Sequence, residues 1–187
     1  MPPATSPSTS LYTLGKGVLS ISPWSGLTPP TLPYTDVGNC PTFDLEVTET
    51  RLDHFTSRYG SRLKDKQVVI EIGYKITFVL DELAVNNMKM LLKATLVGAN
   101  VLRAATVLNT EYALKFVSNN PEGPNYVYLF RRAKLAANGA LNLIGDDWLK
   151  MSFTAEGLAD LANHSESPYF DMTFASTTTS TTTTTPP

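Results

Sequence analysis

A long run of alternating residues between positions 68 and 80 constrains the fold of this chain most. The positions between the apolar ones carry mainly polar or small side chains, such as Glu71, Lys75 and Thr77. A period of two over this length is typical of a β-strand with one buried face, and it does not fit a helix. We therefore predict a long strand whose buried face consists of Val68, Ile70, Ile72, Tyr74, Ile76, Phe78 and Leu80.

A second alternating run precedes the first. Phe43, Leu45 and Val47 alternate there with Asp44, Glu46 and Thr48, so two strands bracket the segment 49–67. A simple hairpin needs only about two to five residues in its loop. The longer connection indicates a projecting arm, and its charged residues are Arg51, Arg58, Arg62, Lys64 and Lys66 against Glu49, Asp53 and Asp65.

The flanking segments carry weaker signals. Residues 14–22 predict a first strand, and five prolines make the segment 23–41 an irregular loop. Asp81 is a suitable N-cap for a helix from about Glu82 to Lys93, because apolar residues then fall roughly on one face. We expect residues 95–107 to be extended or irregular.

The second half returns to alternation and predicts further strands. A hairpin is expected from Tyr112–Phe116 and Tyr126–Phe130 around a turn at 119–124. We expect another strand at 131–137 that turns at Asn138-Gly139 into 140–144, and final strands at 148–155 and 169–174. Many strands, one helix and no βαβ rhythm indicate a mainly β fold, a β-sandwich or barrel with one flanking α-helix and a long inter-strand loop.

The ends of the chain differ from this middle part. Residues 1–10 consist of Pro, Ser, Thr and Ala after Met1, and residues 176–187 are Thr and Ser closed by two prolines. Such segments lack the apolar side chains that order a chain. We predict a flexible N-terminal arm at 1–10, a single β-sandwich domain at 11–175, and a low-complexity tail at 176–187, for which an O-glycosylated stalk is the alternative.

The residues give no support for catalysis, so we predict that the chain is not an enzyme and uses no metal or cofactor. His54 and His164 lie in no metal-ligand spacing, and Cys40 is the single cysteine. The adjacent acids Asp146 and Asp147 are more typical of a solvated turn than of an acid–base pair. With 15 basic and 17 acidic residues the chain has no strong field for nucleic acid, and no apolar run approaches the ~20 residues of a membrane span.

The order of these motifs resembles a known family. Gly15-Lys16-Gly17 leads the first strand, Gly38-Asn39 and Pro41-Thr42-Phe43 lead the next, and Leu52-Asp53-His54, Gly60 and Lys64-Asp65 lie in the arm. With the long alternating strand and the short helix, this order resembles the major tail tube protein of long, non-contractile-tailed bacteriophages. The resemblance is strongest over residues 14–92, and the later segment 148–154 agrees more loosely.

The resemblance implies a β-sandwich whose copies join sheet edges into six-membered rings. These rings would stack into a hollow tail tube for DNA delivery. It implies a place in the virion tail after assembly in the host cytoplasm. The expected partners are further copies of the chain and the tape-measure, tail-terminator and tail-tip proteins, with transient passage of DNA and no membrane insertion. Sheet edges that pair with a neighbour are no longer exposed to aggregation.

In that family the long loop reaches the adjoining ring, which assigns an assembly role to the arm. Its basic residues would meet acidic groups on the neighbour, and its large apolar residues would be anchors. The assigned residues are Arg51, Leu52, Asp53, Phe55, Arg58, Tyr59, Arg62, Leu63, Lys64 and Lys66.

A lumen that passes DNA should be smooth and acidic, because fixed positive charge would hold phosphates. Candidate lumen residues are Asp44, Glu46, Glu49 and Glu71, with an outward solvated face as the alternative. Two other functions stay open. One is the related tube protein of a contractile tail or type VI secretion system, and the other is a monomeric β-sandwich module that binds sugar or a host surface.

Overall fold

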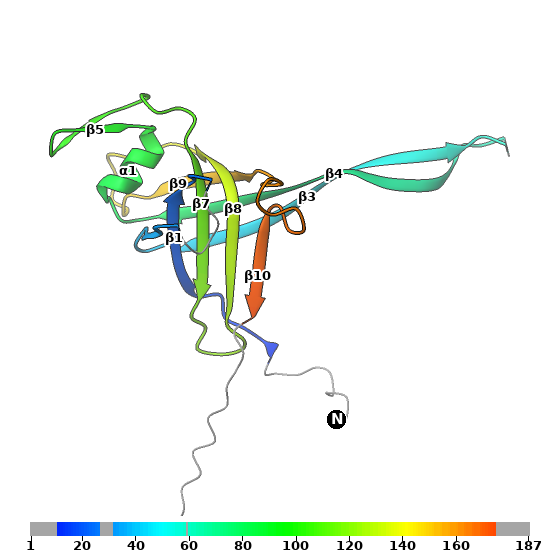
Figure 1. The fold of residues 1–187 in the computed structure, drawn as a ribbon, viewed down its shortest axis with the longest axis horizontal. Coiled ribbons are helices and arrows are strands. Elements are labelled where there is room, and N and C mark those ends of the chain that lie inside the picture. The colour runs from blue at the N-terminus through cyan, green and yellow to red at the C-terminus, as the bar shows by residue number, and fades with distance from the viewer. Residues whose placement is uncertain (1–10, 27–31, 59, 175–187) are drawn as a thin grey trace, which may run out of the picture.

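The computed structural model describes residues 11–26, 32–58 and 60–174 (Figure 1). The predicted N-terminal arm, the Thr/Ser-rich tail and Tyr59 lie outside the described residues. The elements in chain order are β1 (Gly17–Pro23), β2 (Thr35–Asp36), β3 (Thr42–Thr56), β4 (Leu63–Leu80), α1 (Val85–Leu92), β5 (Thr95–Val97), β6 (Val101–Arg103), β7 (Glu111–Ser118), β8 (Tyr126–Ala137), β9 (Met151–Gly157) and β10 (Phe170–Phe174).

One antiparallel sheet in the order β2-β1-β7-β8-β9-β4-β3, with β10 added on β8, folds over to form two layers. β8 joins the layers, because its first half, Tyr126–Phe130, pairs with β10 and its second half, Ala133–Ala137, pairs with β9. Strands β1, β7 and β10 run crosswise to β9, β4 and β3 in Figure 1. The prediction of a mainly β sandwich with one helix is therefore confirmed.

The core lies between these layers. The rings of Phe78 on β4 and Phe153 on β9 stack at 5.0 Å and are fully buried. The ring of Phe43 on β3 stacks on Phe116 of β7 at 4.9 Å, which joins the two layers. The alternation predicted for 74–80 is confirmed here, since Ile76, Phe78 and Leu80 are all buried.

Two predictions for the second half of the chain are wrong. The strand expected at 131–137 is the continuation of β8, and residues 140–144 form no strand. A single long strand forms because Phe130, Ala133 and Leu135 are all buried in one continuous core. The predicted hairpin around 119–124 and the last strand are confirmed as β7–β8 and β10.

The helix is shorter than predicted, and Asp81 does not cap it. The residue before the helix is Ala84, which makes no side-chain cap. The Asp81 carboxylate instead accepts a hydrogen bond from the Asn39 side chain at 2.7 Å, and Glu82 accepts one from the Asn39 backbone N–H at 2.8 Å. The two acids are therefore used to hold the loop before β3, and the helix begins only beyond them.

Candidate functional site

The most prominent feature of the surface is the outer part of the β3–β4 hairpin, residues 48–73, which we call the arm. β3 and β4 pair along their whole length, but β9 pairs only with Lys75–Leu80 of β4. Beyond Tyr74 the hairpin is thus a two-stranded ribbon that projects far from the domain (Figure 1). At its base, the Tyr169 hydroxyl donates a hydrogen bond to the Ile72 carbonyl at 3.0 Å.

The projection predicted from the sequence is present, but most of it is strand and not loop. β3 continues to Thr56 and β4 begins at Leu63, so only the segment 57–62 connects them. Some of the charged residues that suggested a loop bond across the ribbon, since Lys64 on β4 pairs with Asp53 on β3 and His54 on β3 pairs with Asp65 on β4. Solvated charge is therefore compatible with strand pairing in this segment.

Two β-bulges interrupt the arm, and both lie on β4. The pairing passes from Thr50↔Glu71 to Arg51↔Val69, which leaves Ile70 without a partner, and a second shift leaves Asp65 without one. Directly opposed residues share a face, so Val68 lies with Leu52 on the face opposite to Ile72. The predicted alternation of 68–80 is thus wrong beyond Ile70. The predicted burial of Val68, Ile70 and Ile72 is also wrong, because all three are exposed on a ribbon that no third strand covers. A bulge also increases the local twist of a ribbon.

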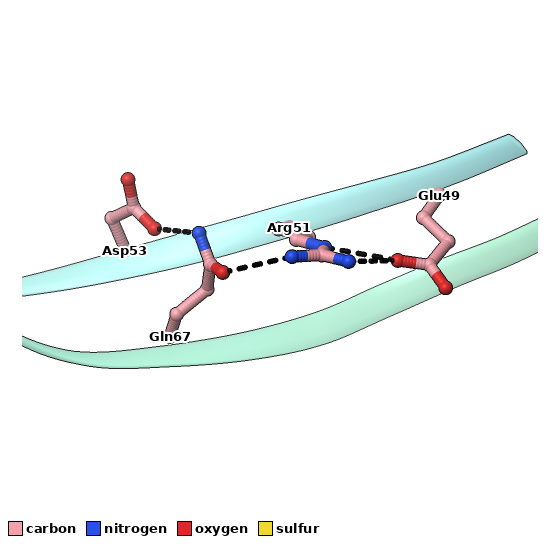
Figure 2. A network of polar contacts seen from close by, with 4 residues as sticks. All are labelled: Glu49, Arg51, Asp53 and Gln67. Atoms are coloured by element: carbon pink, nitrogen blue, oxygen red, sulfur yellow. Dashed lines mark hydrogen bonds and ion pairs between the residues drawn. The ribbon is translucent and has the colours of Figure 1, made fainter.

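A polar network runs along one face of the arm (Figure 2). The Arg51 guanidinium donates to Glu49 at 2.9 Å from Nε and to Gln67 at 3.2 Å from Nη1. Gln67 in turn donates to Asp53 at 2.7 Å, and the Lys64 ammonium lies 2.7 Å from the same carboxylate. The hydrogen bond from Lys64, followed by that from Gln67, lowers the pKa of Asp53. These bonds tie β3 to β4 where no third strand supports them.

The arm also exposes large apolar side chains. Ile70 at the first bulge is 61% exposed and Leu52 is 59% exposed. The guanidinium of Arg62 lies 4.8 Å from the centre of the Phe55 ring, which places a cation on the aromatic face near the tip. These side chains occupy both faces of the ribbon, and exposed apolar surface of this extent indicates an interaction site in a folded protein. The exposed apolar residues of the arm and its base are Val47, Leu52, Phe55, Leu63, Val68, Val69, Ile70 and Ile72.

The structure places the predicted assembly residues on three parts of the arm. Arg51, Leu52, Asp53 and Phe55 lie on β3; Arg58 and Arg62 lie in the connection; and Leu63, Lys64 and Lys66 lie on β4. Tyr59 lies outside the described residues. Arg51 and Lys64 form the ion pairs given above, whereas Arg58, Arg62 and Lys66 have no acidic partner within the described ranges.

The four candidate lumen acids do not share one face. Asp44, Glu46 and Glu71 lie on the outer face of β3 and β4, whereas Glu49 lies on the other face and binds Arg51. The outer face carries a row of alternating charge across five strands, because each neighbouring pair in it is in register. The row is Glu111 on β7, Lys134 on β8, Glu156 on β9, Lys75 on β4 and Glu46 on β3.

Sequence reasoning missed a second exposed apolar site, the β8–β9 loop at residues 141–149. Ile144 is 93% exposed and Trp148 is 89% exposed, with Leu143 also exposed. Both ends of the loop are held, because Leu141 and Leu149 pack against the core. The available signal was a set of large apolar residues beside the turn residues Gly145, Asp146 and Asp147.

The cavities offer little for catalysis. One of about 600 Å³ opens between the layers and is lined largely by aromatic rings, with Lys16 and Cys40 at its side. Burial raises the pKa of the Cys40 thiol to about 11, so this thiol is not a reactive thiolate near neutral pH. Among the described residues, no three His, Cys, Asp or Glu side chains cluster in a way that would hold a metal ion. Within the same ranges no helix has the length and hydropathy needed to cross a membrane.

Comparison with known proteins adds one match. Residues 12–99 match a family model described as "Protein of unknown function UCP028589". The matched segment runs from the residues before β1 to just beyond β5 and includes the whole arm. No curated protein matches the sequence.

Proposed function

We propose that this chain is a structural subunit of a bacteriophage tail tube, and that its copies form stacked rings around a channel for DNA. The arm carries this proposal. A two-stranded ribbon is at best marginally stable in water, and this one exposes large apolar side chains along its length. Contact with another subunit would cover them and hold the ribbon in place.

The edges of the sheet support self-association. β3 ends the strand order, so one side of a fifteen-residue strand pairs with nothing in the described chain. A long free edge is an aggregation hazard unless a partner strand covers it. Pairing with an edge of the next subunit would satisfy these backbone groups, and repetition of that contact would close a ring.

The row of alternating charge on the outer face supports the proposal of a channel for DNA. Lys75 lies in register between Glu46 and Glu156, and Lys134 lies between Glu111 and Glu156. Each of these two cations is flanked by carboxylates on both neighbouring strands, which weakens its attraction for phosphate. We therefore assign this face, with Asp44, Glu46 and Glu71, to the lumen.

Electron microscopy of the purified chain across a concentration series tests the proposal. We expect rings or hollow tubes for the full chain. A matched variant replaces residues 49–72 with Asn-Gly, which joins the opposed residues Thr48 and Gly73 by a two-residue turn. It should stay folded by circular dichroism and fail to form tubes.

A full chain that stays monomeric at every concentration, even with a tail-initiation complex as seed, would contradict the proposal and favour a monomeric binding module. If tubes form equally well without the arm, self-assembly of the chain stands but the arm has no role in it.

A further inference from the structure

We infer that the tip of the arm, residues 55–58 and 60–66, docks on the β8–β9 loop of a second copy of this chain. The inference rests on the proposed self-assembly and names the surface that receives the arm. It joins two exposed sites, each with large apolar side chains beside charged ones, which carry opposite charge and lie near opposite ends of β4.

The β8–β9 loop is built as a presented surface. Leu141 and Leu149 pack on the core and hold its two ends, while Leu143, Ile144 and Trp148 point away from the core and are 75%, 93% and 89% exposed. Large aromatic residues are enriched among the side chains that dominate binding energy at interfaces. A loop with anchored ends and exposed Trp and Ile side chains loses little conformational freedom on binding.

The strand register places the two sites far apart in one copy. Met151, just after the loop, pairs with Leu80, the last residue of β4, whereas the arm tip lies at Leu63, the first residue of β4. The 18 residues of β4 span roughly 60 Å at about 3.3 Å per residue. The arm therefore cannot reach the loop of its own copy, and Figure 1 shows it pointing away from the domain. Only a second copy can bring the two sites together.

The charges of the two sites are complementary. Arg58, Arg62 and Lys66 at the tip have no acidic partner within the described part of the chain, and the exposed Asp146 and Asp147 in the loop have no basic one there. Opposed charges of this kind set the register of a contact and speed its formation.

The apolar groups match in the same way. At the tip, Phe55 lies under the Arg62 guanidinium and Leu63 is exposed beside the connection. In the loop, Trp148 directly follows the two acids. Phe55 and Leu63 lie on opposite faces of the ribbon. An end-on arrangement, with the tip set against Ile144 and Trp148, would therefore bring both side chains into the contact and Arg62 toward Asp147.

Charge reversal tests this contact. We expect Arg62→Glu and Asp147→Arg each to weaken assembly at least tenfold, as measured by the protein concentration needed for assembly in sedimentation experiments. The double variant carries both reversals and restores opposite charge between copies, so its assembly should return to within about threefold of the natural chain. Glu122→Arg, an exposed reversal in the β7–β8 turn, is the matched control and should change little.

Cross-linking gives a direct readout of the contact. In a Cys40→Ser background, one protein carries Leu63→Cys and another carries Ile144→Cys. Mixing the two under mild oxidation should give a disulfide-linked heterodimer, and adding Asp147→Arg to the second protein should weaken it. Assembly without this cross-link and without charge rescue would overturn the docking and leave the tube proposal standing. The cross-link in closed dimers that never form tubes would support the docking and contradict the tube.

Discussion

Among single residues, stability depends most on a few aromatic side chains buried in the core. Phe78 and Phe153 come from neighbouring strands, are fully buried and stack in parallel. Around them the core is completed by smaller residues such as Ala133 and Ala155, which cannot expand to fill a gap. The pair is therefore sensitive to truncation.

We predict that Phe153→Ala lowers the free energy of unfolding by about 3–5 kcal/mol, because it removes a buried ring and leaves a cavity. Urea denaturation of the monomer measures this change. Phe174→Ala, at a position that is 62% exposed, is the matched control and should change the value by less than about 0.5 kcal/mol. Similar losses for both variants would contradict the assignment of the core.

A second residue-scale prediction concerns acid stability. Arg131 is nearly buried and forms an ion pair with Asp171 on β10. Burial raises the pKa of the Asp171 carboxyl, but hydrogen bonds from Ser167 and Arg131 outweigh it and bring the pKa below its ordinary value of 3.8. A lowered pKa in the folded state adds stability above the unfolded pKa, and that stability is lost as the pH falls through the folded pKa.

We therefore expect the free energy of unfolding to fall below about pH 4, and less steeply in Asp171→Asn. At neutral pH this variant should be less stable by about 1–3 kcal/mol, because it leaves the buried guanidinium without its charged partner. Denaturation across the acid range measures both effects. Identical pH profiles for the two proteins would show that Asp171 does not contribute.

At the scale of elements, the helix end is a strained position. Lys93 ends α1 with φ 48° and ψ 50°, a left-handed conformation that side chains other than glycine adopt at a cost. Its backbone N–H still bonds the carbonyl of Met90 at 3.4 Å, and its own carbonyl accepts hydrogen bonds from Thr106 and Val107. The backbone geometry is thus required by its contacts, whatever the side chain.

We predict that Lys93→Gly raises the free energy of unfolding by about 0.5–1 kcal/mol, since glycine adopts this conformation without the steric cost. Lys89→Gly, inside the same helix, should instead lower it by about 1 kcal/mol. Thermal and urea denaturation of both variants provide the comparison. A loss of stability in both would show that the Lys93 side chain matters more than the backbone strain.

At the scale of the whole molecule, the structure combines a well-packed sandwich with a ribbon that has no third strand. Amide exchange depends on local opening, which is easiest where few buried contacts hold the hydrogen bonds. β4 belongs to both the sandwich and the ribbon. Its residues 75–80 lie between β3 and β9, whereas its outer residues pair only with β3.

We predict fast hydrogen exchange at backbone amides of the arm in the monomer and slow exchange for residues 75–80. Assembly should slow exchange in the arm and in the β8–β9 loop together, because docking covers both. Exchange followed by mass spectrometry on dilute and assembled samples measures this. Protection confined to the sandwich edges would indicate that assembly does not involve the arm.

Local pattern predicted much of this fold. Alternation identified the strands around Phe43, Phe78 and Tyr126. A period of two reflects one buried face, and it can be recognised in the sequence without knowing which strands pair. The local capping rule failed at the start of the helix, because the Asp81 carboxylate accepts a hydrogen bond from Asn39 and not from a helix N–H. The competing partner is distant in sequence, so no local rule could have identified it.

Local sequence likewise predicted one part of the candidate site and missed another. The sequence alone determined a mainly β chain with one helix and a charged, apolar projection between two strands, because these depend on periodicity and composition. That Glu49 lies on the face opposite to Glu46 already follows from the period of two, because the two residues are three positions apart on β3. The bulges at Asp65 and Ile70 and the exposure of Trp148 are visible only in the folded chain. Strand register and burial arise from contacts between distant segments, which local sequence does not encode.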